Sequence, residues 1–369
     1  MTHSNSKRIY LIAGEASGDL HGSNLMKELK RSDYELEFRF WGGDLMQKEG
    51  GFLVSHYKDR AVMGIFEVLK NIRKFKKWIA DCKEDILSFK PDILVLIDYG
   101  GFNLRIAEFA KNQGIRVHYY IPPKVWAWNE KRVHKIRKYT DQVYVILPFE
   151  KKYYTRHGVN CEYIGSPVAD EISSSGITPL PEQERKADLI ALLPGSRRQE
   201  IKYILPVMLR YAQANPDKKF QLPAADSIVD LIRSYDIPQN VSIVQGSTYS
   251  VLSKSYAAVV TSGTASLETA LLYTPQVVVY KTGVLTYILG KIFIKVKHLS
   301  PVNLIAGKEV VRELLQFRCN PRSIQREIEK ITTGSHRALV LAAYKKIKDE
   351  IGDPGGSGKV AESILRDLA

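Results

Sequence analysis

The sequence predicts two successive α/β domains, each built around a parallel β-sheet. Short apolar strands alternate with helical segments along the first half of the chain. The run from Ile93 to Ile97 is apolar throughout, as is typical of a strand whose sheet is covered on both faces. Residues 173–181, rich in Ser, Gly and Pro, interrupt the alternation, and a second series of strands and helices follows them.

Each expected element has its own pattern of apolar residues. The first half predicts strands at residues 9–13, 38–41, 93–97, 117–121 and 143–146. Helical patterns occupy residues 22–31, 66–89 and 105–112. The second half predicts strands at residues 189–193, 220–222, 241–244, 257–260 and 276–280. Two such sheets in succession imply a cleft between two domains. We therefore expect domains at residues 1–172 and 185–330, with C-terminal helices over 331–369 that could pack back on the first domain.

Composition narrows the class of protein. A chain of 369 residues, 44% hydrophobic and 25% charged, is typical of a globular protein with two cores. No apolar run approaches the roughly 18 residues that span a bilayer, and residues 1–8 lack a secretory signal. Three scattered cysteines predict a reducing cytosol without a disulfide framework. The net charge of +14 predicts an anionic partner, which nucleic acid, a membrane surface or a phosphorylated substrate could supply.

The segment 257–268 is the most informative motif. An apolar strand runs into Ser262-Gly263-Thr264, and a helix then opens at once with small residues such as Ala265. Such a turn leaves backbone N–H groups unpaired at the positive end of a helix, which suits a phosphate. Glu268, one helical turn later, could accept hydrogen bonds from a sugar hydroxyl. The alternative is an ordinary turn, in which Ser262 or Thr264 caps the helix and Glu268 completes a capping box.

A second turn of this kind opens the second domain at residues 193–200. Gly195 and Ser196 offer backbone donors, and Arg197 adds a permanent positive charge whose planar fork suits phosphate. A surface arginine at a helix start is the alternative, and it is mildly unfavourable with the helix dipole. Two such turns in one domain predict a bound nucleotide diphosphate. No two aspartates stand two positions apart, so the D-x-D pattern of metal-dependent sugar transfer is missing, and we expect neither a metal nor a cofactor.

Two features of the first domain are candidate parts of the site. Residues 14–22 follow the first strand and carry three glycines without a Walker A ending, and Asp19 there could simply cap a helix. Asp98 ends a buried strand, and the carboxyl ends of parallel strands face the ligand crevice. Its carboxylate could act as general base for a hydroxyl, or it could order the loop that follows.

Residues 63–79 mix large apolar and basic side chains. Isoleucines and a leucine fall near helical spacing, aromatic residues lie beside them, and lysines occupy the flank. This composition predicts an interfacial helix that enters lipid headgroups. The alternative is a core-facing amphipathic helix with a solvated basic face. The residues expected to contact the membrane are Ile65, Phe66, Leu69, Ile72, Arg73, Lys76, Lys77 and Trp78.

Together these motifs resemble the lipid-A-disaccharide synthases, the bacterial glycosyltransferases of family 19. The matching pieces run in order from residue 9 to about residue 316. They comprise residues 13–19, 61–64, 67–68, 97–98, 102–103, 125–128, 131–132, 147–150, 193–197, 262–265, 301, 303–304, 306–307 and 313–316. The resemblance implies the GT-B architecture, in which two Rossmann-like domains face a central cleft.

The resemblance also implies a reaction and a role for each candidate residue. A 2,3-diacylglucosamine unit would pass with inversion from its UDP donor to 2,3-diacylglucosamine 1-phosphate, giving the β-1,6 disaccharide 1-phosphate and UDP. Asp98 would be the base, and Ser17 and Asp19 would line the acceptor side. Glu268 would hold the ribose. The residues implied to hold UDP or its diphosphate are Gly195, Ser196, Arg197, Gly263, Thr264, Ala265 and Asn303.

The acyl chains of both substrates would explain why residues 63–79 have the composition of a membrane-contacting segment. Acylated substrates must be collected from a membrane, so the resemblance implies a cytoplasmic protein at the inner leaflet of the inner membrane and no nucleic-acid partner. The oligomeric state stays open. Three positions depart from the family's pattern: Pro122-Pro123-Lys124 replaces Ser-Pro-Ser, Ser166 replaces a histidine and Gly101 replaces an aspartate. They concern donor contacts and acyl-chain selectivity more than the reaction class.

Two rival functions fit parts of the sequence. An enzyme of the same fold, such as a UDP-N-acetylglucosamine 2-epimerase, would turn over a water-soluble UDP-sugar and would leave residues 63–79 unexplained. A non-catalytic lipid- or nucleic-acid-binding protein would use the charge of +14, with Trp126 and Trp128 available to stack on bases. Such a protein would not depend on Asp98.

Overall fold

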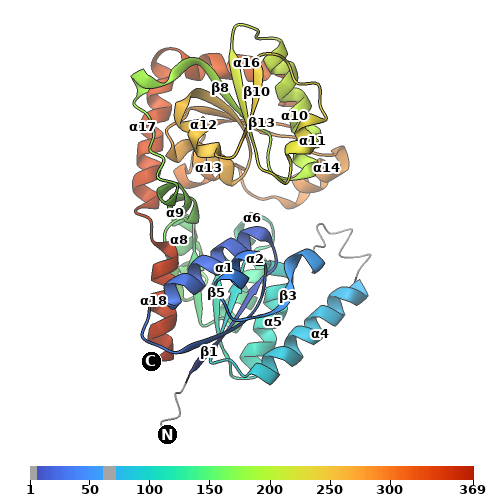
Figure 1. Cartoon of the computed structure of the whole chain (residues 1–369), viewed down its shortest axis with the longest axis vertical. Coiled ribbons are helices and arrows are strands. Elements are labelled where there is room, and N and C mark those ends of the chain that lie inside the picture. Colours follow the sequence, from blue (N-terminus) through green and yellow to red (C-terminus); the bar gives the residue numbers. More distant parts are fainter. Residues whose placement is uncertain (1–5, 61–71) are drawn as a thin grey trace. The chain divides into compact units, whose positions relative to one another are not determined.

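The computed structural model of the chain describes residues 6–60 and 72–369 (Figure 1). These residues form two compact units. The described parts of residues 1–167, together with 355–369, make the N-terminal unit, and residues 168–354 make the C-terminal unit.

The N-terminal unit contains one parallel sheet. Its seven strands among the described residues follow the order β3-β2-β1-β4-β5-β6-β7. The strands are β1 (Lys7–Ala13), β2 (Leu36–Gly42), β3 (Phe52–His56), β4 (Ile93–Ile97), β5 (Arg116–Tyr120), β6 (Gln142–Val145) and β7 (Cys161–Tyr163). The described helices are α1 (Ala16–Leu29), α2 (Asp44–Lys48), α4 (Ile72–Phe89), α5 (Gly100–Asn112), α6 (Val125–Trp128), α7 (Val133–Tyr139), α8 (Pro148–Arg156) and α18 (Gly356–Leu368), with 3-10 turns η1 (Tyr57–Arg60) and η2 (Glu130–Arg132).

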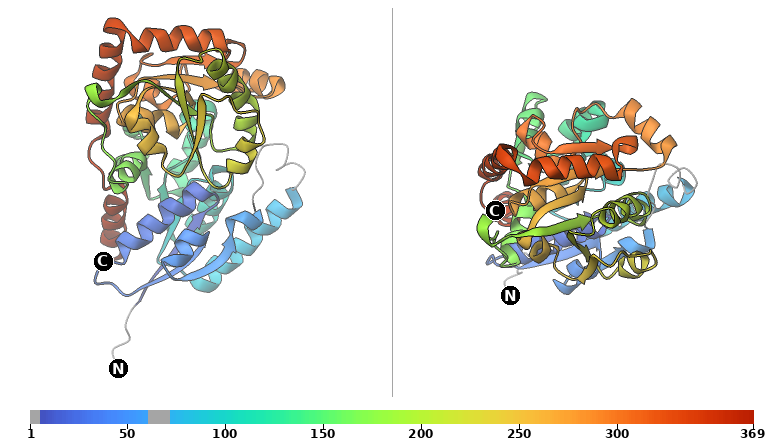
Figure 2. Two further views of the ribbon diagram at one scale, coloured as in Figure 1. Left: turned by 45° about the horizontal axis from the view of Figure 1, so that its top comes forward. Right: turned by 90° about the horizontal axis from the view of Figure 1, so that it is seen from above.

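Alternate residues of the central strands enter two separate hydrophobic cores. In β4, Leu94 and Leu96 join the core that is covered by α4, α5, α7 and α8, whereas Ile93, Val95 and Ile97 join the core covered by α1 and α18. Figure 2 shows helices on both faces of this sheet. The apolar run at residues 93–97 is therefore a strand buried on both sides, as predicted.

The C-terminal unit contains a second parallel sheet. Six strands are described, in the order β10-β9-β8-β11-β12-β13. They are β8 (Lys186–Leu193), β9 (Lys219–Ala224), β10 (Val241–Gln245), β11 (Ser255–Thr261), β12 (Gln276–Tyr280) and β13 (Arg312–Leu315). The helices are α9 (Pro167–Ser174), α10 (Arg198–Gln213), α11 (Val229–Arg233), α12 (Thr248–Lys254), α13 (Thr264–Leu271), α14 (Val284–Phe293), α15 (Pro301–Ala306), α16 (Pro321–Thr332) and α17 (Gly334–Ile351), with 3-10 turns η3 (Glu182–Glu184) and η4 (Gln316–Arg318).

The boundaries of the two units differ from the predicted ranges. Helix α9, from Val168 onward, belongs to the C-terminal unit, and its Ile172 packs on the hydrophobic core of that unit. Helix α17 also stays in that unit, where its Tyr344 is buried and meets Gln276 of β12. Only α18 returns to the N-terminal unit, and it packs beside α1 (Figure 1).

In both sheets, the order in which the chain adds strands reverses at one point. In the N-terminal unit the chain builds outward from β1 through β2 to β3 and then places β4 on the other side of β1. In the C-terminal unit β11 likewise lies on the side of β8 that β9 and β10 leave open. Parallel sheets bind ligands at the carboxyl ends of the strands where such a reversal occurs.

Candidate functional site

The reversal in the N-terminal unit brings two predicted segments to one sheet edge. The turn after β1 leads into α1 with Ser17 in its first turn, and the turn after β4 leads into α5 with Asp98 at its start. Because β1 and β4 are paired neighbours, both turns lie at the carboxyl edge of the sheet. Ser17 is exposed there and Asp98 is partly exposed.

The backbone at Asp98 is held in an uncommon conformation. Asp98 and Tyr99 have φ angles of 49° and 46°, in the left-handed region that non-glycine residues rarely adopt. Three neighbours fix this turn. The Tyr119 hydroxyl donates to the Asp98 carbonyl at 2.8 Å, the Asn103 amide donates to the same oxygen at 2.9 Å, and the Asp98 N–H donates to the Tyr120 carbonyl at 3.1 Å. Strained residues of this kind, costing about 1–3 kcal/mol each, concentrate at functional sites.

Two arginines that the sequence reasoning did not assign to the site lie near this turn. The Arg132 guanidinium stacks 4.5 Å over the Trp128 ring, and the Arg105 guanidinium lies 5.4 Å over the Phe75 ring. Partial burial lowers the pKa of Arg132, and the positive charge of Arg105 lowers it further. Within the described residues neither arginine forms an ion pair with a carboxylate, and Arg105 Nη1 donates to the Gly101 carbonyl. Arg132 lies in a segment that matches the family. Its closeness to Arg105 is visible only in three dimensions.

Asp19 has a structural task. Its buried carboxylate accepts hydrogen bonds from the backbone N–H groups of Gly43, Leu45 and Met46, at 2.7, 3.0 and 3.1 Å. Asp19 therefore caps the start of α2 from outside that helix. If Asp19 serves the acceptor side, it does so by positioning the loop around Gly43.

The three departures from the family's pattern have different surroundings. A Cβ added to Gly100 would meet the Pro123 ring at 2.6 Å, so the Pro122-Pro123-Lys124 segment packs against the start of α5. The space around Gly101 is open within 4 Å, so an aspartate would fit there. Ser166 is buried.

The reversal in the C-terminal unit brings together the two turns predicted to bind phosphate. Gly195 (φ 108°) follows β8 and Gly263 (φ 155°) follows β11, in backbone conformations that favour glycine. Strands β8 and β11 are paired neighbours, so α10 and α13 begin beside each other at the carboxyl edge of the sheet. Ser196 and Thr264 are exposed, Ala265 is partly exposed, and no atom lies within 4 Å of a Cβ built on Gly263.

The first turn of α13 carries no side-chain cap in the described structure. Gly263 is the N-cap residue, so neither Ser262 nor Thr264 occupies that position, and the alternative of a capping box with Glu268 does not form. The open amides of this helix start are the kind of group that binds an anion. At α10 the N-cap residue is Arg197, whose side chain is 63% exposed and lies 3.8 Å from Glu200.

Glu268 and Glu171 form a pair of neighbouring carboxylates that the sequence did not predict. Burial raises the pKa of Glu268 to about 7, and the negative charge of Glu171 on α9 adds to this shift. Burial also raises the pKa of Glu171, although the Tyr249 hydroxyl donates to that carboxylate at 3.2 Å. Three segments distant in sequence supply these side chains, so periodicity could not have grouped them.

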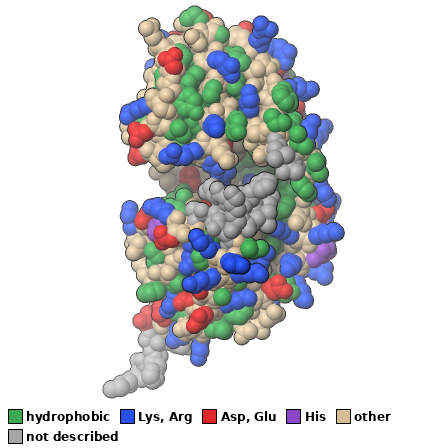
Figure 3. Space-filling view, turned by 90° about the vertical axis from the view of Figure 1, so that its right-hand side faces the viewer, with side chains coloured by type: hydrophobic (Ala, Val, Ile, Leu, Met, Phe, Trp, Pro, Cys, Tyr) green, Lys and Arg blue, Asp and Glu red, His purple; other side chains and the backbone are tan. Residues whose placement is uncertain are grey.

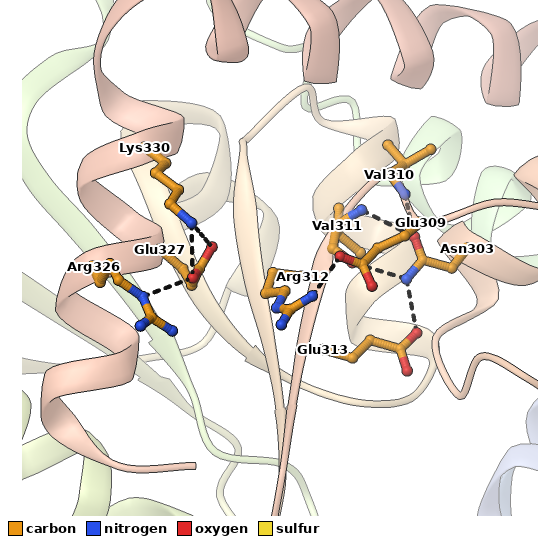
Figure 4. A network of polar contacts seen from close by, with 9 residues as sticks. All are labelled: Asn303, Glu309, Val310, Val311, Arg312, Glu313, Arg326, Glu327 and Lys330. Carbon is orange, nitrogen blue, oxygen red and sulfur yellow. Dashed lines mark hydrogen bonds and ion pairs between the residues drawn. The ribbon is translucent and has the colours of Figure 1, made fainter. Parts of the chain in front are cut away.

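Asn303 does not present its side chain at the surface. It is fully buried, and its amide donates to the Val311 carbonyl and to Glu313, both at 2.8 Å. Its oxygen accepts from the N–H groups of Val310 and Val311, at 2.7 and 2.9 Å (Figure 4). Every hydrogen-bonding position of the amide is used. The Asn303 side chain is therefore not available to bind a diphosphate directly, and its role is to position α15.

Part of the predicted membrane-contacting segment lies outside the described residues, namely Ile65, Phe66 and Leu69. Of the rest, Ile72, Arg73, Lys76 and Lys77 are exposed on α4. Trp78, contrary to the prediction, packs against the core of the N-terminal unit, as Phe75 and Ile79 do. The described part of α4 thus combines a core-facing apolar side with an exposed basic side.

The described residues contain neither a membrane-spanning helix nor a cluster of metal-binding side chains. Over residues 6–60 and 72–369, no helix is long and apolar enough to cross a bilayer. Within the same ranges, no group of three or more His, Cys, Asp or Glu side chains could hold a metal ion.

Comparisons with known proteins agree with these features. Residues 9–352 match the family model described as lipid-A-disaccharide synthetase. The lipid-A-disaccharide synthase of Syntrophus aciditrophicus is 38% identical over 375 residues, covering 98% of each chain. Two solved structures share the fold: the glycotransferase of kitacinnamycin (TM-score 0.69, 12% identity, 99% and 100% coverage of this chain and that one) and the UDP-GlcNAc 2-epimerase of Neisseria meningitidis bound to UDP-GlcNAc (0.64, 15%, 97% and 100%).

Proposed function

Since the chain belongs to the lipid-A-disaccharide synthase family, we propose that it transfers 2,3-diacylglucosamine from its UDP donor to 2,3-diacylglucosamine 1-phosphate. The products are a β-1,6 disaccharide 1-phosphate and UDP. An epimerase function is less well supported, because the epimerases share the fold at 15% identity or less, whereas the synthase relatives match nearly the whole chain at 34–39%. The fold is the GT-B arrangement of two parallel-sheet domains.

The donor binds to the C-terminal unit in this proposal. The observation that carries it is the pair of glycine turns at Gly195 and Gly263, which flank the reversal of the sheet and open onto two helix starts. The amides of α13 and the Arg197 guanidinium would hold the diphosphate. As the glycosidic bond to UDP breaks, the same groups would stabilise the negative charge on the leaving diphosphate, which requires no metal or cofactor.

Asp98 is the proposed general base. The acceptor hydroxyl attacks the anomeric carbon from the face opposite UDP, so a single displacement inverts that carbon. The hydroxyl must lose its proton as the new bond forms, and a nearby carboxylate can take it. The hydrogen bonds from Tyr119 and Asn103 hold the turn that places Asp98 at the edge of the sheet.

The acceptor side combines exposed Ser17 with the basic pair Arg105 and Arg132. Neither arginine has a carboxylate partner among the described residues, and the acceptor carries a phosphate that two guanidinium groups can bind. We place this phosphate beside them. Asp19 and Asn303 serve as positioning residues for the two turns.

Peripheral membrane association completes the proposal. Ile72 with Arg73, Lys76 and Lys77 on α4 would contact anionic headgroups of the inner leaflet, where acylated substrates reside.

The test is to mix the purified protein with both acylated substrates and to measure disaccharide formation. Asp98→Asn should lower kcat by about 10²–10⁴-fold, and Arg197→Ala should lower it by about 10²–10³-fold. Arg198→Ala, an exposed neighbour on the same helix start, is the matched control and should retain activity. Disaccharide formation at the wild-type rate in both site variants would refute the site. Turnover of UDP-N-acetylglucosamine without a lipid acceptor would favour the epimerase instead.

A further inference from the structure

A row of exposed apolar side chains lies on α14 of the C-terminal unit. This helix is far from α4 in the sequence. Thirteen large hydrophobic side chains are exposed among the described residues, and five of them fall within residues 284–294. These five, which we call the α14 ridge, are Val284, Ile288, Ile292, Phe293 and Ile294, with exposed fractions between 41% and 68%. Scattered exposed apolar residues are ordinary, whereas a contiguous group marks an interaction surface.

The spacing of the ridge follows from helix geometry. Val284, Ile288 and Ile292 are four residues apart, so they line one face of α14, and Phe293 and Ile294 extend the ridge at its end. Figure 1 places α14 at the outside of the C-terminal unit, and Figure 3 shows hydrophobic side chains gathered along one edge of that unit with basic side chains beside them. A helix of ten residues is about 15 Å long, too short to cross a bilayer.

The charge around the ridge has one sign. Residues 281–308 contain five lysines and no aspartate or glutamate. Lys291, Lys295 and Lys297 are exposed, and no described carboxylate pairs with them. Lys291 lies with its ammonium group 5.6 Å from the Tyr287 ring centre, so its stem runs along the helix. Apolar side chains flanked by unpaired lysines are typical of a helix that lies in a lipid headgroup layer, with lysines reaching the phosphates.

We propose that the α14 ridge docks on an anionic bilayer surface. Charge complementarity selects this occupant over the others. Interfaces between proteins are depleted of lysine, and a second copy of this chain would bring the same unpaired positive charges against the ridge. The inference goes beyond the proposed function, because it assigns a lipid contact to the C-terminal unit, whatever the reaction.

The proposal is tested by flotation of the full-length protein with phosphatidylcholine vesicles, with and without phosphatidylglycerol. Ile292→Ser/Phe293→Ser should lower partitioning to the mixed vesicles by about tenfold or more. The matched control is Phe317→Ser/Leu339→Ser, which removes two other exposed hydrophobic side chains of the same unit and should partition as the wild type does. Circular dichroism confirms that each variant is folded.

A second pair of variants tests the charge. Lys291→Gln/Lys295→Gln should lower partitioning to the anionic vesicles by about thirtyfold, because each lysine near such a surface contributes about 1 kcal/mol. Partitioning to phosphatidylcholine alone should stay unchanged. The control is Lys345→Gln/Lys346→Gln on α17, where both lysines are exposed.

Three results would overturn the proposal. One is wild-type partitioning of both the Ile292→Ser/Phe293→Ser and the Lys291→Gln/Lys295→Gln variants, and another is an equal loss in the controls. The third is a ridge variant that binds vesicles normally but changes the oligomeric state measured by light scattering, which would make the ridge a contact between copies. Turnover of detergent-dispersed substrates is measured in parallel. Normal turnover with lost partitioning supports the ridge, whereas lost turnover with normal partitioning bears on the proposed reaction alone.

Discussion

At the scale of single residues, the strongest signal for chemistry is backbone geometry that the sequence does not display. Asp98 was predicted from its place at the end of a buried strand. No sequence pattern predicts that Asp98 and Tyr99 both have positive φ angles. The fixing contacts come from Tyr119 on the neighbouring strand and Asn103 on the following helix. Position along a strand can thus be read from one sequence, whereas the conformation of a turn depends on tertiary neighbours.

Glu268 gives a prediction about pH at the same scale. Its pKa in the folded protein, about 7, lies above the ordinary value of 4.5, so between these values the folded state binds more protons than the unfolded state. The free energy of unfolding therefore falls as pH rises from about 4.5 to about 7, by up to roughly 3 kcal/mol. Glu268→Gln removes this dependence and should be more stable than the wild type at pH 8, as measured by urea unfolding at several pH values.

The same variant separates stability from ligand binding. If Glu268 accepts hydrogen bonds from the ribose, UDP should bind the ionised carboxylate better, so its affinity should increase through pH 7 in the wild type and not in Glu268→Gln. Glu171→Gln is the companion variant, because removing the neighbouring negative charge should lower the pKa of Glu268 and shift both profiles to lower pH. Identical profiles in all three proteins would contradict the assignment.

At the scale of elements, every central strand was predictable, but of the four edge strands only β10 was predicted. The ten predicted strands all appear, because buried parallel strands are continuous apolar runs. Strands β3, β7 and β13 were missed. All three are edge strands, are three to five residues long, and mix polar with apolar residues. Their pairing is set by neighbours in the sheet more than by local composition.

The capping of α2 by Asp19 makes a prediction about an element. Asp19→Ala leaves the N–H groups of Gly43, Leu45 and Met46 without their acceptor, so it should destabilise the N-terminal unit by about 1–3 kcal/mol. Ser17→Ala, an exposed position on the same helix, should leave stability within about 0.5 kcal/mol. Chemical denaturation compares the two. Equal stability of both variants would show that Asp19 does not hold this turn.

At the scale of the whole molecule, the chain's last helix belongs to its first unit. Val360, Ala361, Ile364 and Leu368 of α18 complete the core of the N-terminal unit. The sequence predicted a return of the C-terminal helices, but residues 331–369 do not act as one piece, because α16 and α17 carry their own contacts within the C-terminal unit. Amphipathic periodicity identifies such helices, yet it cannot say which of two cores each one covers.

The return of α18 can be tested by a single substitution. Ile364→Ala should lower the free energy of unfolding by about 2–5 kcal/mol, since Ile364 is fully buried in the N-terminal core. Glu362→Ala, exposed on the same helix, is the control and should change it little. Hydrogen exchange then locates the effect. Loss of protection in β1 and α1 is expected, and loss confined to the C-terminal unit would contradict the placement of α18.

In the proposed site, main-chain amides at Gly195 and Gly263, together with Arg197, bind the diphosphate of a uridine nucleotide. Calorimetric titration of UDP into the protein measures this binding. We expect binding by the wild type and by Arg198→Ala, and an affinity at least about tenfold lower for Arg197→Ala, which loses a charge-assisted contact. Absence of binding heat at several temperatures, or equal affinity in all three proteins, would show that these groups do not bind the diphosphate.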